Sequence, residues 1–192
     1  MTVQKRLIMS ILPPAALAGL VSVVLATSLT GCGEAGASDD PTVHALGEFV
    51  AVPFFPIDSV AGDPTGEGRV AITDVRAGST EELAAAGFTL DPDEAAAKPY
   101  YVDVSYENTG TTPVEPREPS GVDADGDLIT SLTIIDFGGP AFDLCPRVPE
   151  HLAPGATATG CSIVLVPEGA VLAEVSYLAD ATEPFVYWRA ER

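Results

Sequence analysis

The amino-acid sequence predicts an all-β fold, an antiparallel β-sandwich with one short helix, which follows a signal peptide and a flexible tether. Residues 100–107 (YYVDVSYE) alternate with a period of two, so that one face is apolar and the other largely polar. Six or seven segments of strand length recur along the chain with turn-forming words between them, which is typical of a sandwich. A basic start followed by a long apolar run sets the first residues apart as a targeting segment.

The targeting segment is predicted to be a lipoprotein signal peptide that spans residues 1–31. Lys5 and Arg6 form its basic start, and positions 7–31 hold no charged residue. The run ends in Leu-Thr-Gly-Cys, which resembles the lipobox of bacterial lipoproteins. The resemblance implies that the thiol of Cys32 takes a diacylglyceryl group and that the chain is cut just before this residue. We therefore expect a mature protein held by lipid at the extracytoplasmic face of the cell membrane.

Two alternatives to a lipoprotein signal are an uncleaved membrane anchor and a plain secreted protein. The 25 uncharged residues 7–31 are long enough to span a bilayer, which takes about 20. Pro13 and Pro14 count against one continuous helix, because each removes a backbone donor and clashes with the preceding turn. The position of Cys32 at the end of the apolar run favours the lipoprotein.

The mature chain is strongly acidic. Residues 1–31 hold two of the nine Lys and Arg and none of the 28 Asp and Glu, so the formal charge of −19 becomes −21 after cleavage. Such a chain is a poor candidate for binding nucleic acid, because phosphate binding relies on clustered Lys and Arg. The acidity also repels an anionic membrane surface, so we expect the lipid to hold the protein there. Solubility is one interpretation of the acidity, and cation binding is the sharper alternative.

The sequence predicts three segments: the signal peptide, a lipidated N-terminus with a flexible tether at residues 32–68, and a sandwich at residues 69–192. Residues 33–47 are small and polar without periodicity, and residues 48–55 (EFVAVPFF) form a possible first strand between two loose stretches. The length of the mature chain suits one domain.

The sandwich strands are predicted from β-branched and aromatic runs bounded by turn words. They are residues 70–76, 100–107, 128–135, 159–166, 171–178 and 185–189. One helix is predicted at residues 80–86, because Ser79 and Glu82 have the capping-box spacing and Gly87 follows as a stop.

Cys145 and Cys161 are predicted to form a disulfide. They are the two cysteines of the mature chain besides the lipidated one, and an exported protein meets an oxidising environment. The alternatives are a redox-active pair or a metal site. The CxxC spacing of redox motifs is absent, and no further Cys or His lies at zinc-site spacing.

Asp123, Asp125 and Asp127 are the candidate metal ligands. Three carboxylates at alternate positions resemble the beginning of an EF-hand loop, in which oxygen ligands surround Ca²⁺. The match then fails, since Leu128 stands where that loop needs glycine and Ile134 where it needs glutamate. A solvated turn that leads into the next strand is the alternative.

Catalytic chemistry has little support in the sequence. His44 lies in the predicted tether, His151 lies in the proline-rich loop between the two cysteines, and no nucleophile-elbow word is present. Residues 53–56 (PFFP) and Trp188 are either exposed recognition residues or core residues. We therefore expect no catalytic residues, no cofactor and no enzymatic activity.

The chain resembles the immunoglobulin-like lipoproteins of unknown function from actinobacteria, similar to DUF4352-type domains. The resembling words are residues 70–78 (VAITDVRAG), 100–110 (YYVDVSYENTG), 151–169 (HLAPGATATGCSIVLVPEG) and 186–189 (VYWR). The resemblance implies an immunoglobulin-like sandwich and supplies no catalytic residues.

The expected function is that of a non-enzymatic binding or interaction module of the cell envelope. Its partner would be a cell-wall polymer, another exported protein or a small ligand. The alternative is an envelope accessory or sensor protein that takes up a divalent cation such as Ca²⁺ at Asp123, Asp125 and Asp127. A weaker third hypothesis is an envelope hydrolase with two catalytic carboxylates.

Overall fold

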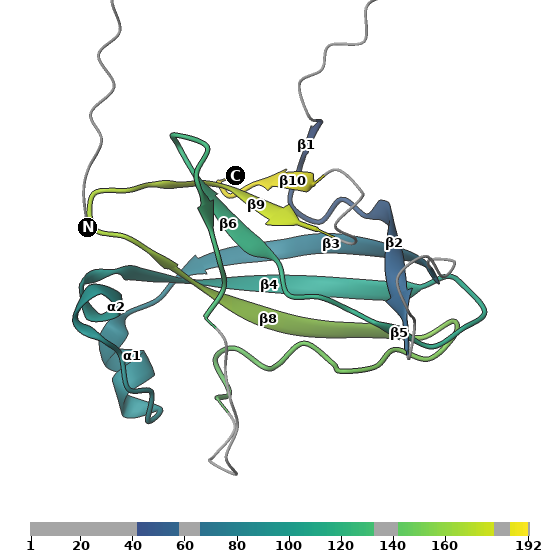
Figure 1. The fold of residues 1–192 in the computed structure, drawn as a ribbon, viewed down its shortest axis with the longest axis horizontal. Coiled ribbons are helices and arrows are strands. Elements are labelled where there is room, and N and C mark those ends of the chain that lie inside the picture. The colour runs from purple at the N-terminus through teal and green to yellow at the C-terminus, as the bar shows by residue number, and fades with distance from the viewer. Residues whose placement is uncertain (1–41, 58–65, 133–141, 179–184, 192) are drawn as a thin grey trace, which may run out of the picture. The chain divides into compact units, whose positions relative to one another are not determined.

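Two β-sheets pack face to face in the computed structural model, which describes residues 42–57, 66–132, 142–178 and 185–191. These residues belong to one unit, Asp39–Arg192 (Figure 1). The predicted all-β sandwich is thereby confirmed. Residues 1–31 and Cys32 lie outside the described residues, and within those residues no helix is long and apolar enough to cross a membrane.

The first sheet contains five strands, and all its neighbouring pairs are antiparallel except β1 with β10, which is parallel. In spatial order its strands are β1 (Val43–His44), β10 (Val186–Arg189), β9 (Leu172–Tyr177), β6 (Ser120–Asp123) and β7 (Leu128–Ile129).

The second sheet is antiparallel throughout and contains the three longest strands. In spatial order its strands are β5 (Val114–Glu115), β2 (Val50–Pro56), β3 (Gly66–Ala77), β4 (Lys98–Asn108) and β8 (Thr157–Val166). A register shift between Ile72 and Asp74 interrupts the β3–β4 ladder.

The main core lies between the sheets. Val102, Val104 and Tyr106 of β4 face it, as the period-two pattern predicts, and the side chain of Trp188 is fully buried in it. The indole Nε1–H of Trp188 donates a hydrogen bond to the carbonyl of Glu48, 3.0 Å away. Burial of these apolar side chains provides the main driving force that holds the two sheets together.

A second, smaller cluster lies on the outer face of the second sheet. Leu83 of α1 (Thr80–Ala85) packs there with Tyr101, Ile163 and the Cys145–Cys161 pair. Because this cluster covers the outer face at one end, Tyr101 is buried although it points away from the main core.

The predicted helix is confirmed, with its capping box formed by Ser79 and Glu82. A second helix, α2 (Pro92–Ala96), was not predicted. Asp91 caps it, Pro92 follows, and the side chain of Glu94 returns to the backbone N–H of Asp91. The local signals of a helix start were therefore present, but the helix is only five residues long.

The sandwich starts earlier than the predicted boundary at Arg69. β1 and β2 both belong to the sheets, although they fall within residues 32–68, the predicted tether. β2 is the possible first strand predicted at residues 48–55. β1 is two residues long and depends on pairing with β10, at the far end of the chain, so no local pattern reveals it. The short strands β5 and β6 were also not predicted, and in residues 128–135 the described strand is limited to Leu128–Ile129, while 133–135 lie outside the described residues.

Candidate functional site

Cys145 and Cys161 form the predicted disulfide. Cys161 lies on β8 opposite Asp103 of β4, and both cysteines are almost fully buried. The bond ties the segment around Cys145 to the outer face of the second sheet, where the backbone N–H of Cys161 also donates to the carbonyl of Pro146. Its burial is typical of a structural disulfide.

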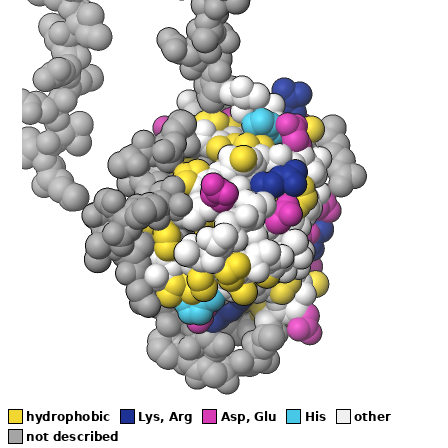
Figure 2. Space-filling model, turned by 90° about the vertical axis from the view of Figure 1, so that its right-hand side faces the viewer, with side chains coloured by type: hydrophobic (Ala, Val, Ile, Leu, Met, Phe, Trp, Pro, Cys, Tyr) yellow, Lys and Arg dark blue, Asp and Glu magenta, His cyan; other side chains and the backbone are white. Residues whose placement is uncertain are grey.

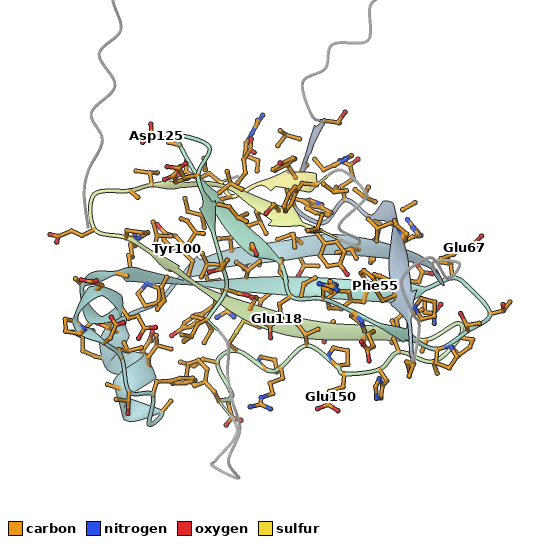
Figure 3. All side chains as sticks on the ribbon, viewed as in Figure 1. Phe55, Glu67, Tyr100, Glu118, Asp125 and Glu150 are labelled. Atoms are coloured by element: carbon orange, nitrogen blue, oxygen red, sulfur yellow. A yellow bond between two sulfur atoms is a disulfide. The ribbon has the colours of Figure 1, made fainter. Side chains whose placement is uncertain are left out.

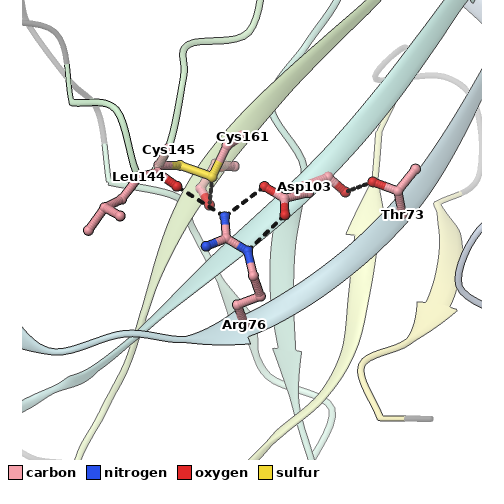
Figure 4. A network of polar contacts seen from close by, with 7 residues as sticks. Thr73, Arg76, Asp103, Leu144, Cys145 and Cys161 are labelled. Carbon is pink, nitrogen blue, oxygen red and sulfur yellow. Dashed lines mark hydrogen bonds and ion pairs between the residues drawn. A yellow bond between two sulfur atoms is a disulfide. The ribbon is translucent and has the colours of Figure 1, made fainter.

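A polar network beside the disulfide fastens the same segment (Figure 4). Arg76 donates through Nε and Nη2 to the two carboxylate oxygens of Asp103, at 2.8 and 2.9 Å, and its Nη2 also donates to the carbonyl of Leu144 at 3.0 Å. The guanidinium lies over the ring of Tyr101, 5.4 Å from its centroid. Hydrogen bonding to Asp103 raises the pKa of Arg76. The network positions a loop, and nothing in it is arranged for proton transfer.

The acidic turn does not bring its three carboxylates together as a metal site. Oδ1 of Asp123 accepts hydrogen bonds from the backbone N–H groups of Asp125 and Asp127, at 3.0 and 2.8 Å. Gly126 has a positive φ of 86°, which closes the turn. Among the residues that the structure describes, no group of three His, Cys, Asp or Glu could hold a metal ion. The turn alternative therefore explains this sequence.

Most of the other candidates from the sequence occupy structural positions. Nδ1 of His44 lies 2.8 Å from Oε1 of Glu48, and this hydrogen bond lowers the pKa of Glu48. Phe54 is buried in the core, while Phe55 is half-buried with the guanidinium of Arg117 over its ring at 4.2 Å. Trp188 is a core residue, and His151 is exposed.

A hollow of about 580 Å³ between the end of β8, β7 and α2 is the feature that sequence reasoning missed. Its lining mixes apolar side chains with two hydroxyl-bearing residues and one carboxylate. The lining residues are Glu94, Leu128, Ile129, Thr130, Ser131, Leu132, Leu165 and Pro167. Its volume lies within the roughly 300–1,000 Å³ of ligand pockets, and Leu128 is half exposed. The one signal in the sequence was Leu128 itself, an apolar residue directly after an acidic turn.

Two smaller hollows have volumes of about 450 and 310 Å³; the larger of them lies at β2 and β3, and the other at β4 and β8. Arg69 lines the larger, and Phe49 and Ser105 line the smaller. The guanidinium of Arg69 is already occupied, by Glu107 at 3.1 Å and by the Phe49 ring at 4.9 Å. Figure 2 looks at the end of the molecule away from the helices and shows Lys and Arg beside Asp and Glu, interspersed with hydrophobic side chains.

No protein-family model and no curated protein sequence matches this chain. Among solved structures, the chain is similar to the crystal structure of the yjhA protein from Bacillus subtilis. The two share 14% sequence identity and a TM-score of 0.44, over 78% of this chain and 100% of the other.

Proposed function

We propose that this protein is a lipid-anchored, non-enzymatic binding module of the bacterial cell envelope, one of the immunoglobulin-like lipoproteins that resemble DUF4352-type domains. The Leu-Thr-Gly-Cys word at residues 29–32 supports the lipid anchor. The buried Cys145–Cys161 disulfide fits an oxidising, extracytoplasmic location, because such bonds persist there.

The observation that carries the binding role is the hollow beside Leu128. It is open to solvent, five of its eight lining residues are apolar, and its one acidic residue, Glu94, is hydrogen-bonded to the backbone N–H of Asp91. A concave site that combines apolar side chains with a few polar groups is the default candidate for ligand binding. The cation-binding alternative receives no support from the geometry of Asp123.

The fold also bears on how far the module would stand from the membrane. Because β1 begins at Val43, ten residues (33–42) separate it from the proposed lipid at Cys32. A fully extended chain of that length spans at most about 40 Å. The proposed module would thus act within a few nanometres of the lipid surface.

Metabolic labelling of the full chain in a bacterial host tests the anchor. With a clickable fatty-acid analogue, we expect label on the wild type, cleavage after Gly31 and recovery in the membrane fraction. Cys32→Ser should remove both the label and the membrane association, while Cys145→Ser should keep the label. A wild-type chain recovered from the cytosol with its leader intact and no label would contradict the proposal.

Crosslinking in intact envelopes tests the binding role. A photo-crosslinking residue at Leu128 should capture a discrete partner, and the same residue at exposed Glu150, on the far side of the second sheet in Figure 3, serves as the matched control. Identical crosslinking patterns at the two positions would count against a binding role for the hollow.

A further inference from the structure

The hollow lies at one end of the sandwich. Lys98, the first residue of β4 after α2, pairs with Val166 at the end of β8, and Pro167 of the hollow follows Val166 directly. The acidic turn reaches the same end, since the backbone N–H of Ala124 donates to the carbonyl of Val171. Figure 1 shows both helices on the left of the molecule, and Figure 3 shows Asp125 on that side as well.

This end carries a marked excess of negative charge. Nine acidic residues lie on its two helices and their caps, the acidic turn and the β8–β9 turn: Glu81, Glu82, Asp91, Asp93, Glu94, Asp123, Asp125, Asp127 and Glu168. Neither helix has a basic residue in its last turn.

The cations near this end are largely engaged by other groups. Arg76 is held by Asp103, and the ammonium of Lys98 lies over the ring of Tyr100, 4.9 Å from its centroid. Exposed Arg189 lies in register beside Glu174 of β9. The acidic residues of this end outnumber its cations, and their net field attracts a cationic partner.

Exposed apolar side chains beside the hollow favour a partner that is partly apolar as well as cationic. Leu128 is 50% exposed, and Val171, beside the acidic turn, is 58% exposed. When a partner covers large apolar side chains that are exposed to water, their burial stabilises the complex. A purely ionic partner would leave this surface uncovered.

We propose that the hollow binds a cationic polypeptide segment that places an apolar side chain against the exposed Leu128 and its Lys or Arg side chains against Glu94 and the neighbouring carboxylates. The inference rests on the proposed binding role and names its partner class. The negative charge of this end repels polyanions. An uncharged polymer would gain no affinity from that charge.

The orientation of the chain agrees with this assignment. β1, through which the chain would connect to the proposed lipid anchor, pairs with Tyr187 and Trp188 of β10, which lie opposite Ser176 and Val175 in the C-terminal half of β9. The acidic turn follows β6, whose last residue pairs with the first residue of β9. The hollow and the N-terminal strand thus lie toward opposite ends of β9, which leaves the acidic end accessible to a partner.

A peptide titration tests the inference on the full chain purified in mild detergent. The probe is a short fluorescent peptide in which Lys and Leu alternate, and fluorescence anisotropy measures its Kd. Two control peptides replace every Leu with Ala or every Lys with Glu. We expect the probe to bind at least about tenfold more tightly than either control, and its affinity to fall as salt is raised from about 0.05 to 0.5 M.

Matched variants locate the site. Glu94→Gln removes one charge but keeps an acceptor for the Asp91 N–H, so the cap of α2 is preserved. It should weaken binding of the probe about fivefold, as should Leu128→Asn, which removes an exposed apolar side chain from the lining. Glu81→Gln, an exposed acid on α1 outside the lining of the hollow, should change the Kd by less than about twofold.

Circular dichroism confirms that each variant is folded. Equal Kd values for Glu94→Gln, Leu128→Asn and Glu81→Gln would overturn the inference, and so would tight binding of the Ala peptide, which would show non-specific attraction to charge. The titration does not depend on lipidation, so its failure is distinguishable from a failure of the fatty-acid labelling.

Discussion

Arg76 shows how one side chain can hold a loop to a sheet. Its guanidinium spans Asp103 of β4 and the carbonyl of Leu144, next to the disulfide. The Arg76 and Asp103 side chains keep 39% and 30% of their surface exposed, so solvent screens the pair and limits its contribution. The bidentate geometry and the bond to Leu144 add specificity that a simple charge pair lacks.

Replacement of Arg76 with lysine should therefore lower the free energy of unfolding more than is usual for such a conservative substitution. Lysine keeps the charge but cannot bind both oxygens of Asp103 and the Leu144 carbonyl at once. We expect Arg76→Lys to lower the free energy of unfolding by about 1 kcal/mol in urea titrations. Arg69→Lys is the control, because Arg69 contacts Glu107 through one nitrogen and should lose less than about 0.5 kcal/mol. Equal losses would contradict this account.

The disulfide closes a loop across a sequence separation of 16 residues. The chain-entropy estimate for such a loop is about 3 kcal/mol, mainly through restriction of the unfolded chain. The Cys145→Ala, Cys161→Ala double variant should lose about that much stability in urea unfolding, and the wild type in reductant should match it. An unchanged midpoint in the reduced protein would show that the loop is held by Arg76 and packing alone.

Three buried tyrosines predict sensitivity to alkaline pH. Burial raises the pKa of Tyr101 to about 12 and raises the pKa of Tyr106 and Tyr177 as well. The Tyr106 hydroxyl donates to the carbonyl of Arg117 at 2.6 Å, and the backbone N–H of Arg117 donates to the Tyr177 hydroxyl at 3.2 Å.

Stability changes with pH according to whether the folded or the unfolded chain binds more protons. Above a pH of about 10 the unfolded chain loses its tyrosine protons while the folded chain retains them, so stability is complete below about pH 10 and falls above it. Each tyrosine contributes at most about 1.4 kcal/mol per pH unit. Urea unfolding at pH 9, 10 and 11 should show the fall, and Tyr101→Phe should make it shallower. A stability that is flat over this range would refute the assignment.

Among the elements, the pairing of β2 with β3 depends on a glycine. Because this glycine has no side chain, an aromatic ring of β2 can lie against the backbone of β3. Gly68 lies under the ring of Phe54, which packs near Tyr106 and Tyr177 with centroid distances of 6.3 and 6.4 Å. A Cβ at Gly68 would overlap the Phe54 ring. The ring has no free volume to move into, because it is buried in the main core.

Gly68→Ala should therefore be costly although it adds only one methyl group. We expect a loss of about 2 kcal/mol or more, since an overpacked core must shift side chains and backbone. Glu67→Ala, at the exposed neighbouring position of β3, serves as the control and should stay within about 0.5 kcal/mol. Thermal unfolding measures both. Similar stabilities for the two variants would mean that β2 moves freely to accommodate the methyl group.

For the whole molecule, the dominant long-range force is repulsion among its acidic side chains. The full chain carries a formal charge of −19, and four cations of the described residues lie over aromatic rings. An increase of NaCl from about 10 to 100 mM shortens the Debye length from about 30 to 10 Å. The melting temperature should rise by about 2–4 °C, which corresponds to about 1 kcal/mol.

The same measurement distinguishes screening from a cation site. At equal ionic strength, CaCl₂ and MgCl₂ should shift the melting temperature equally, because Asp123 is bonded to its own turn. A shift specific to Ca²⁺, abolished by Asp125→Ala, would restore the cation-binding alternative.

Local patterns in the sequence determined the long strands, the helix α1 and the disulfide. These features can be predicted without knowledge of the fold. The alternation in β4 and the Ser79–Glu82 spacing depend on residues close in sequence, and the cysteine pairing depends on the redox state of the compartment. The strand at residues 185–189 was also predicted, but β1 and its pairing with β10 were not, because parallel pairing between the two ends of the chain is a long-range contact. The same is true of the second cluster, in which α1 and the disulfide bury the outward-facing Tyr101.

The sequence by itself determined that this is an acidic β-sandwich protein with one disulfide-competent pair of cysteines, and its lipobox-like word predicts a leader. Only the tertiary structure decided that Asp123 serves its own turn, that Trp188 is a core residue, and that Glu94 and Leu128 border one hollow. The physical reason is that strand identity follows from local periodicity, whereas a surface site depends on which turns the sheet pairing brings to the same end.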